Sequence, residues 1–171
     1  MSAKFQPPRL IIVMGVAGSG KSSVGEALAR RLGGVFLDGD SYHPAANIEK
    51  MSRGEALTDA DRWPWLESLA RAMAEREGVV IGGCSALRRA YRDRITATAG
   101  EPVLFAHLAG SKELIWQRMS ARKNHFMPIS LLESQFATLE RPAVDENAIE
   151  VPIDGSVTDI AAEIAARRTG R

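Results

Sequence analysis

The sequence is poor in cysteine and carries little excess charge of either sign. Its single cysteine, Cys84, excludes an internal disulfide and a zinc site built from cysteines. The 22 basic and 21 acidic side chains leave a net charge of +1, which gives no reason to expect a nucleic acid or an acidic membrane as a partner. The apolar run from Leu10 to Val13 is far shorter than the roughly 20 residues that span a bilayer. We therefore expect a reduced, cytoplasmic protein.

The length of 171 residues predicts a single domain over residues 1–171. Short apolar runs alternate with amphipathic segments, which predicts an α/β fold with a parallel sheet. The expected strands are Leu10–Met14, Val35–Leu37, Val79–Ile81, Val103–Ala106 and Ile149–Ile153, the last at an edge because it contains Pro152. Helices are expected over Lys21–Leu32, around Leu66–Met73 with Pro64 in the first turn, over Leu114–Arg122 and Leu131–Leu139, and after Ser156.

A phosphate-binding loop follows the first predicted strand. The segment GVAGSGKS, residues 15–22, matches the P-loop pattern GxxxxGK[ST] between a strand and a helix. Its glycines let backbone N–H groups surround an anion, and the helix N-terminus adds partial positive charge. We expect Lys21 to reach the β- and γ-phosphates of a nucleotide and the Ser22 hydroxyl to bind Mg²⁺. The motif does not identify the phosphoryl acceptor.

Two carboxylates follow the second predicted strand. Asp38 and Asp40 stand two residues apart on an expected extended chain, so their side chains should point the same way. One of them is suited to hold Mg²⁺ through water, and the other to accept the proton of an attacking hydroxyl. An ordinary Asp-Gly turn is the alternative. His43 follows directly, and a lone histidine of this kind is more often structural than catalytic.

Basic side chains follow the third and fourth predicted strands. We expect most of Arg88, Arg89, Arg92 and Arg94 to form a solvated helix face, with one or two of them neutralising an anionic substrate. Cys84 has no base beside it and is expected to be a small core residue. The segment from Arg118 to Gln135 stands where a P-loop kinase carries its lid, whose arginines stabilise the transferring phosphoryl group. A helix with solvated arginines is the alternative.

These linked motifs resemble those of the small P-loop gluconokinases, which phosphorylate D-gluconate. The resemblance rests on MGVAGSGKS (14–22), FLDGDSYHP (36–44), NIEKMSRGEALTDADRWPWL (47–66), CSALRRAYRDRI (84–95) and ARKNHFMPISLLESQFATLERP (121–142). It implies a P-loop NTPase fold like that of nucleoside and shikimate kinases: three layers, a five-stranded parallel sheet and a mobile lid at about 118–135. It also implies Mg-ATP as co-substrate, D-gluconate as substrate, 6-phosphogluconate as product, and a homodimer.

The resemblance also implies roles for individual residues. Lys21, Asp40 and Arg122 are expected to be catalytic, and Asp40 to orient the gluconate hydroxyl. Ser22 and Asp38 are expected to serve Mg²⁺. The ATP phosphates are expected to meet Gly15, Val16, Ala17, Gly18, Ser19, Gly20, Lys21, Ser22 and Ser23. Besides Asp40, the expected gluconate contacts are His43, Arg62, Arg88, His125 and Gln135. Arg141 is either a further substrate contact or a solvated residue.

Two other hypotheses for the function are considered. One is a different small-metabolite kinase of the same fold, such as shikimate kinase; a nucleotide acceptor fits less well, because no base-stacking pocket is evident. The other is a non-catalytic nucleotide-binding switch. Paired carboxylates and a basic lid argue against a switch, because it has no need of a site that activates a hydroxyl.

Overall fold

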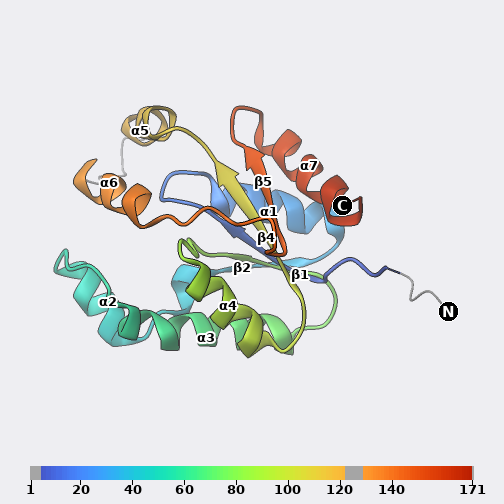
Figure 1. The fold of residues 1–171 in the computed structure, drawn as a ribbon, viewed down its shortest axis with the longest axis horizontal. Coiled ribbons are helices and arrows are strands. Elements are labelled where there is room, and N and C mark those ends of the chain that lie inside the picture. Colours follow the sequence, from blue (N-terminus) through green and yellow to red (C-terminus); the bar gives the residue numbers. More distant parts are fainter. Residues whose placement is uncertain (1–4, 122–128, 171) are drawn as a thin grey trace.

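A five-stranded parallel sheet forms the centre of the molecule (Figure 1). The structure is a computed structural model that describes residues 5–121 and 129–170. The strands follow the order β2-β3-β1-β4-β5 across the sheet. Their bounds are Leu10–Met14 (β1), Val35–Asp38 (β2), Val80–Gly83 (β3), Val103–Ala109 (β4) and Ala148–Pro152 (β5). The predicted parallel sheet and the edge position of the strand with Pro152 are therefore confirmed.

Helices cover both faces of the sheet, so the fold has three layers (Figure 1). On one face lie α1 and α7, and on the other α3 and α4. The helices are Lys21–Leu32 (α1), Ala45–Ser52 (α2), Asp59–Glu75 (α3), Arg89–Ala99 (α4), Lys112–Ser120 (α5), Ile129–Thr138 (α6) and Val157–Thr169 (α7). A short 3-10 helix, η1, spans Gly39–Tyr42. Among the described residues, no helix combines the length and the hydropathy needed to cross a membrane.

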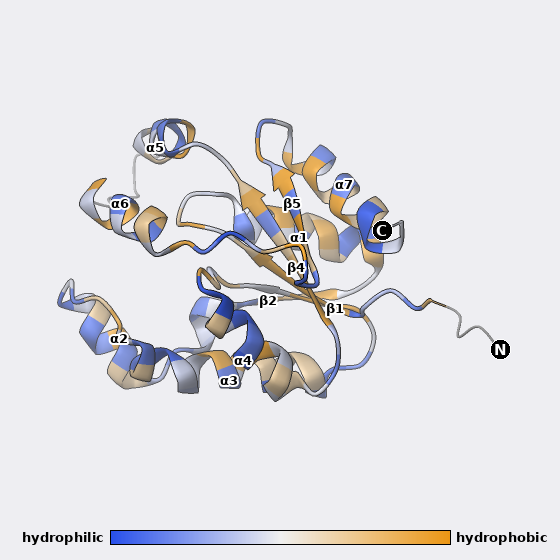
Figure 2. Ribbon diagram, in the orientation of Figure 1, coloured by the Kyte–Doolittle hydropathy of each residue, from blue (hydrophilic) through white to orange (hydrophobic). Residues whose placement is uncertain are grey.

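The strand sequences are apolar because both faces of each central strand are buried. All five residues of β1 are buried, and Figure 2 shows the central strands as largely hydrophobic. Ile11 and Val13 join the core beneath α1 and α7, whereas Leu10, Ile12 and Met14 join the core beneath α3 and α4. This division follows from the alternation of side chains along a strand.

Helix α3 begins earlier than the sequence analysis predicted. Thr58 caps it through a reciprocal pair: its Oγ1 accepts the N–H of Asp61, and the Asp61 carboxylate accepts the N–H of Thr58. The helix therefore starts at Asp59, and the prediction that Pro64 lies in its first turn was wrong. The T-x-x-D pattern at residues 58–61 is the signal that was missed. Helix α2 and η1 were not predicted either.

Candidate active site

The loop after β1 has a backbone suited to an anion. Gly18 and Gly20 have φ angles of +79° and +98°, a region that favours glycine. A Cβ at Gly18 would lie 2.5 Å from Cγ of Met119, so a side chain there would also clash. Gly20 is the N-cap of α1, and the positive end of this helix dipole therefore meets the loop. The Oγ of Ser19 is buried and has no hydrogen-bond partner among the described residues.

Lys21 folds back over this loop from the first turn of α1. Its Nζ donates hydrogen bonds to the carbonyl oxygens of Gly15 and Val16, each at 3.0 Å. Burial lowers the pKa of Lys21, and the negative charges of Asp40 and Asp38 oppose part of this shift. Since Asp38 ends β2 and Asp40 follows it, the fold brings together an ammonium group after β1 and two carboxylates at the end of β2.

The two carboxylates do not lie on one extended chain, contrary to the sequence prediction. Asp38 ends β2, and its Oδ1 accepts the backbone N–H of Asp40 at 3.0 Å. This bond caps η1, so Asp40 lies in the first turn of a 3-10 helix rather than on a continuing strand. Both side chains are exposed. The Asp-Gly turn and the paired carboxylates, treated as alternatives, therefore coexist here.

His43 lies close enough to Asp40 to feel the charge of its carboxylate, and its ring is supported by an aromatic side chain. Its ring stacks on Trp65 with a centroid distance of 4.0 Å and an interplanar angle of 19°. Trp65 in turn donates from Nε1 to the carbonyl oxygen of Gly39 at 2.8 Å, which ties η1 to α3. Burial lowers the pKa of His43; the Asp40 carboxylate opposes this shift, and Arg62 adds to it. The lowered pKa favours the neutral ring at pH 7, a form with one donor and one acceptor nitrogen.

Arg62 and Arg88 converge on one carboxylate, that of Asp59. The Asp59 Oδ1 is 3.5 Å from Nη1 of Arg62, and its Oδ2 is 3.6 Å from Nη1 of Arg88. Tyr91 completes the group: its hydroxyl donates to Asp59 Oδ1 at 2.5 Å and accepts from Nη1 of Arg62 at 3.1 Å. The fold thus brings the two predicted arginines together. The sequence analysis missed Asp59 and Tyr91, which lie on different helices.

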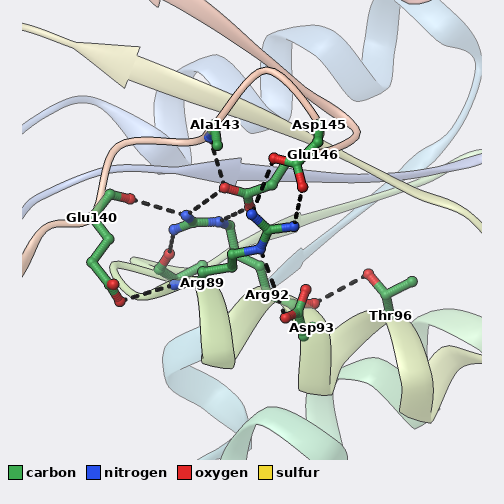
Figure 3. Close-up of polar contacts among 9 residues, drawn as sticks. Arg89, Arg92, Asp93, Thr96, Glu140, Ala143, Asp145 and Glu146 are labelled. Carbon is green, nitrogen blue, oxygen red and sulfur yellow. Dashed lines mark hydrogen bonds and ion pairs between the residues drawn. The ribbon is translucent and has the colours of Figure 1, made fainter.

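Arg92 does not lie on the solvated helix face that the sequence analysis predicted, whereas the side chains of Arg89 and Arg94 stay 43% and 41% exposed, as expected. Arg92 is only 1% exposed and is paired with Glu146 through bonds of 2.7 and 3.1 Å (Figure 3). Arg89 forms two hydrogen bonds with Asp145. Arg94 lies over the ring of Trp63. Arg89 and Arg92 bind the segment after α6, and Arg94 contacts helix α3. Of the four arginines at residues 88–94, Arg88 is the one that reaches the Asp59 carboxylate.

The loop after β3 supports the phosphate-binding loop. The carbonyl oxygen of Ser85 accepts a hydrogen bond from the backbone N–H of Gly15 at 3.2 Å. Ala86 has a φ angle of +45°, unusual for a residue with a Cβ, and its carbonyl oxygen accepts a hydrogen bond from Nη1 of Arg92 at 2.8 Å. Cys84 is buried, and burial raises the pKa of its thiol to about 12. The interpretation of Cys84 as a core residue is therefore confirmed.

Helix α6 contacts the phosphate-binding loop through Gln135. The Oε1 of Gln135 accepts the backbone N–H of Ala17 at 2.6 Å, so Gln135 contacts the loop in this structure, and its role toward gluconate stays a prediction. Arg122 and His125 lie outside the described residues. Arg141 is exposed and pairs with Glu150, which also contacts the buried ring of His107.

Known proteins are similar to this chain in sequence and in fold over most of its length. A family model described as an AAA domain matches residues 10–142. A gluconokinase from Gluconobacter oxydans (strain 621H) is 47% identical, with 84% of this chain and 82% of the relative covered. The thermoresistant gluconokinase of Escherichia coli (strain K12) is 43% identical, with 92% and 94% covered.

Solved structures agree with these sequence comparisons. The crystal structure of a gluconokinase from Sinorhizobium meliloti 1021 superposes with a TM-score of 0.88 at 44% identity, covering 97% of this chain and 94% of that one. A shikimate kinase from Aquifex aeolicus shares the fold alone, with a TM-score of 0.59 at 18% identity over 94% of this chain and 96% of that one. On these grounds the chain belongs to the gluconokinase family of P-loop kinases.

Proposed function

We propose that this protein transfers the γ-phosphoryl group of Mg-ATP to a hydroxyl of D-gluconate, giving 6-phospho-D-gluconate and ADP. The observation that supports this proposal most strongly is the row of groups from Lys21 to the arginine pair. The Asp40 carboxylate acts on the pKa of Lys21 and on that of His43. His43 ends η1 and stacks on Trp65 of α3, and Arg62 lies on the same helix, three residues before Trp65. A substrate with a hydroxyl at one end and a carboxylate at the other matches this row.

At the hydroxyl end of the row, Asp40 would act on the acceptor hydroxyl and Lys21 on the phosphates of ATP. Asp40 would orient the acceptor hydroxyl and take its proton as the oxygen bonds to the γ-phosphorus. The bond from the γ-phosphorus to the bridging oxygen breaks, and ADP leaves. Lys21 would turn from the carbonyl oxygens of its own loop to the phosphates and stabilise their negative charge. Arg122 is proposed to add a second cation from the lid segment.

The donors near the phosphate-binding loop fit Mg²⁺. Protein sites for this ion often supply one or two carboxylates or hydroxyls and leave the other positions to phosphates and water. Ser22 follows Lys21 in the chain, and the charge of Asp38 acts on the pKa of Lys21. Both Ser22 and Asp38 are exposed, and they would hold the ion. When bound, Mg²⁺ neutralises phosphate charge and helps to align the transferring group.

At the carboxylate end of the row, Arg62 and Arg88 would bind the carboxylate of gluconate. The planar guanidinium group can grip a carboxylate with two parallel hydrogen bonds. His43 would hydrogen-bond the hydroxyls between the two ends, because its ring is favoured in the neutral form and fixed against Trp65. His125 and Gln135 are proposed as further contacts to the polyol.

The test is release of ADP from Mg-ATP with a panel of acceptors: D-gluconate, related sugar acids, shikimate, nucleoside monophosphates and water. Turnover that requires D-gluconate, with 6-phosphogluconate as the product, is expected. Turnover with another acceptor alone would overturn the substrate assignment and keep the kinase chemistry. Binding of ATP without turnover on any acceptor would favour the nucleotide-binding switch.

We also propose a homodimer and a cytoplasmic location, as the family resemblance implies. Sedimentation of the full chain at micromolar concentration tests the first point, and a monomer would contradict it. Fractionation of the cells that express the protein tests the second.

A further inference from the structure

The carboxylate of Asp59 lies between two guanidinium groups, those of Arg62 and Arg88. Both arginine distances, 3.5 and 3.6 Å, are longer than ordinary hydrogen bonds. The short bond of Asp59 goes instead to the Tyr91 hydroxyl at 2.5 Å. The arginines are therefore attracted to Asp59 without giving it close hydrogen bonds, and such bonds remain for another anion to form.

The contacts of the Asp59 side chain are not explained by a role in capping helix α3. The cap of α3 is built by Thr58 and Asp61, whose side chains satisfy each other's backbone N–H groups. Asp59 is the first residue of the helix, and its carboxylate contacts Arg62 one turn later, together with Arg88 and Tyr91 from the neighbouring segment. The side chain is directed at the site rather than at its own helix end.

The negative charge of Asp59 can offset the repulsion between Arg62 and Arg88. Two guanidinium groups that must share one substrate carboxylate repel each other, and a fixed carboxylate between them reduces that repulsion. Tyr91 is 3% exposed, so its hydroxyl holds Asp59 from a rigid position. The ring of Tyr91 also lies 5.3 Å from Cζ of Arg62, which limits where that side chain can go.

We propose that Asp59, held by Tyr91, is a positioning residue that keeps Arg62 and Arg88 together and so sets the preference of the site for an acceptor with a carboxylate. This inference rests on the proposed function, because it assigns the arginine pair to the carboxylate of the acceptor. Asp59 acts through the arginines and takes no part in phosphoryl transfer.

The experiment compares Asp59→Asn with wild type on D-gluconate and on D-gluconamide, a neutral acceptor of nearly the same shape. We expect KM for gluconate to rise about ten-fold or more, because Arg62 and Arg88 are no longer held together and so lose charge-assisted contacts to the carboxylate of gluconate. The kcat and the KM for Mg-ATP should change little. The ratio of kcat/KM for gluconate to that for gluconamide should fall, whereas a general structural defect would lower both values alike.

Three further variants make the test specific. Asp59→Glu keeps the charge and should recover part of the gluconate KM. Tyr91→Phe removes the hydroxyl and should shift KM in the same direction by less. Glu67→Gln is the matched control: Glu67 also joins α3 to α4, through Arg94 at 2.7 Å, and its loss should leave both acceptors unaffected.

Two results would overturn the proposal. A gluconate KM that falls in Asp59→Asn would mean that Asp59 competes with the substrate instead of positioning its partners. An unchanged acceptor ratio would mean that the side chain has no effect on carboxylate preference. If wild type itself fails to phosphorylate gluconate, the proposed function fails first, and the two failures are therefore distinguishable.

Discussion

Removal of the Arg92 side chain should destabilise this protein severely. Arg92→Met keeps most of the apolar volume and removes the guanidinium group, which makes four hydrogen bonds: two to Glu146, one to the carbonyl oxygen of Ala86 and one to that of Glu140. The Glu146 side chain is only 7% exposed. After the substitution it would be a buried charge whose described hydrogen bond comes from the N–H of Ala143 at 2.8 Å.

The expected loss follows from the general cost of breaking a buried ion pair. Removing one partner costs about 3–5 kcal/mol, because the other charge stays buried and uncompensated. For a chain of this size, each kcal/mol shifts the melting temperature by about 2–4 °C, so Arg92→Met should melt about 10 °C below wild type. Glu146→Gln added to Arg92→Met should recover part of the loss, because the lone charge is then gone.

Urea unfolding followed by circular dichroism measures the free energy of unfolding, and thermal scans give the melting temperature. Arg89→Met is the matched control on the same helix: Arg89 pairs with Asp145 (Figure 3), the two side chains are 43% and 62% exposed, and exposed pairs contribute little. This control should unfold close to the wild-type midpoint. An Arg92→Met variant as stable as the control would refute the argument that burial makes the Arg92 pair indispensable.

Three further predictions concern single side chains. Asp40→Asn should lower gluconate-dependent ADP release by about 10²–10⁴-fold while calorimetry still detects ATP binding; near-normal turnover would contradict its assigned role. Hydrogen bonds from Lys50 and Thr58 lower the pKa of Asp61 to about 2, so its contribution to stability is present above its unfolded pKa of about 4 and is lost as pH falls toward 2. The difference in unfolding free energy between wild type and Asp61→Asn should therefore shrink over that range, and a constant difference would argue against the cap. With its thiol pKa raised to about 12 by burial, Cys84 should resist a maleimide at pH 8 until the protein is unfolded; rapid labelling of the native protein would show that the thiol is accessible.

Local sequence patterns predicted most of the secondary structure. Helix α1 was predicted at Lys21–Leu32, where it lies, and β1 at Leu10–Met14. Both are defined by the periodicity of neighbouring residues, and the glycines at 33 and 34 mark the end of α1. The predicted second strand ended one residue early and the last strand was displaced by one residue, because patterns define the middle of an element better than its ends.

The phosphate-binding loop was predictable for the same reason. Its glycines, Lys21 and Ser22 are adjacent in the chain, so their spacing alone carries the chemistry. The geometry of Asp40 was not predictable in this way. A hydrogen bond from its own N–H to Asp38 turns the chain into η1, and Trp65, which lies 26 residues after Gly39, stabilises that turn through the Gly39 carbonyl oxygen.

The sequence by itself determined the alternation of the strands with most of the helices along the chain, the phosphate-binding loop and the family, because each depends on residues that are close in the chain or on whole motifs. Only the tertiary structure decided which charges are buried and which meet. Arg92 and Glu146 are 54 residues apart in sequence, and Tyr91 and Asp59 are 32 apart. Their pairing depends on how α3, α4 and the segment after α6 pack, and burial then makes each pair matter, since a charge removed from water needs a partner.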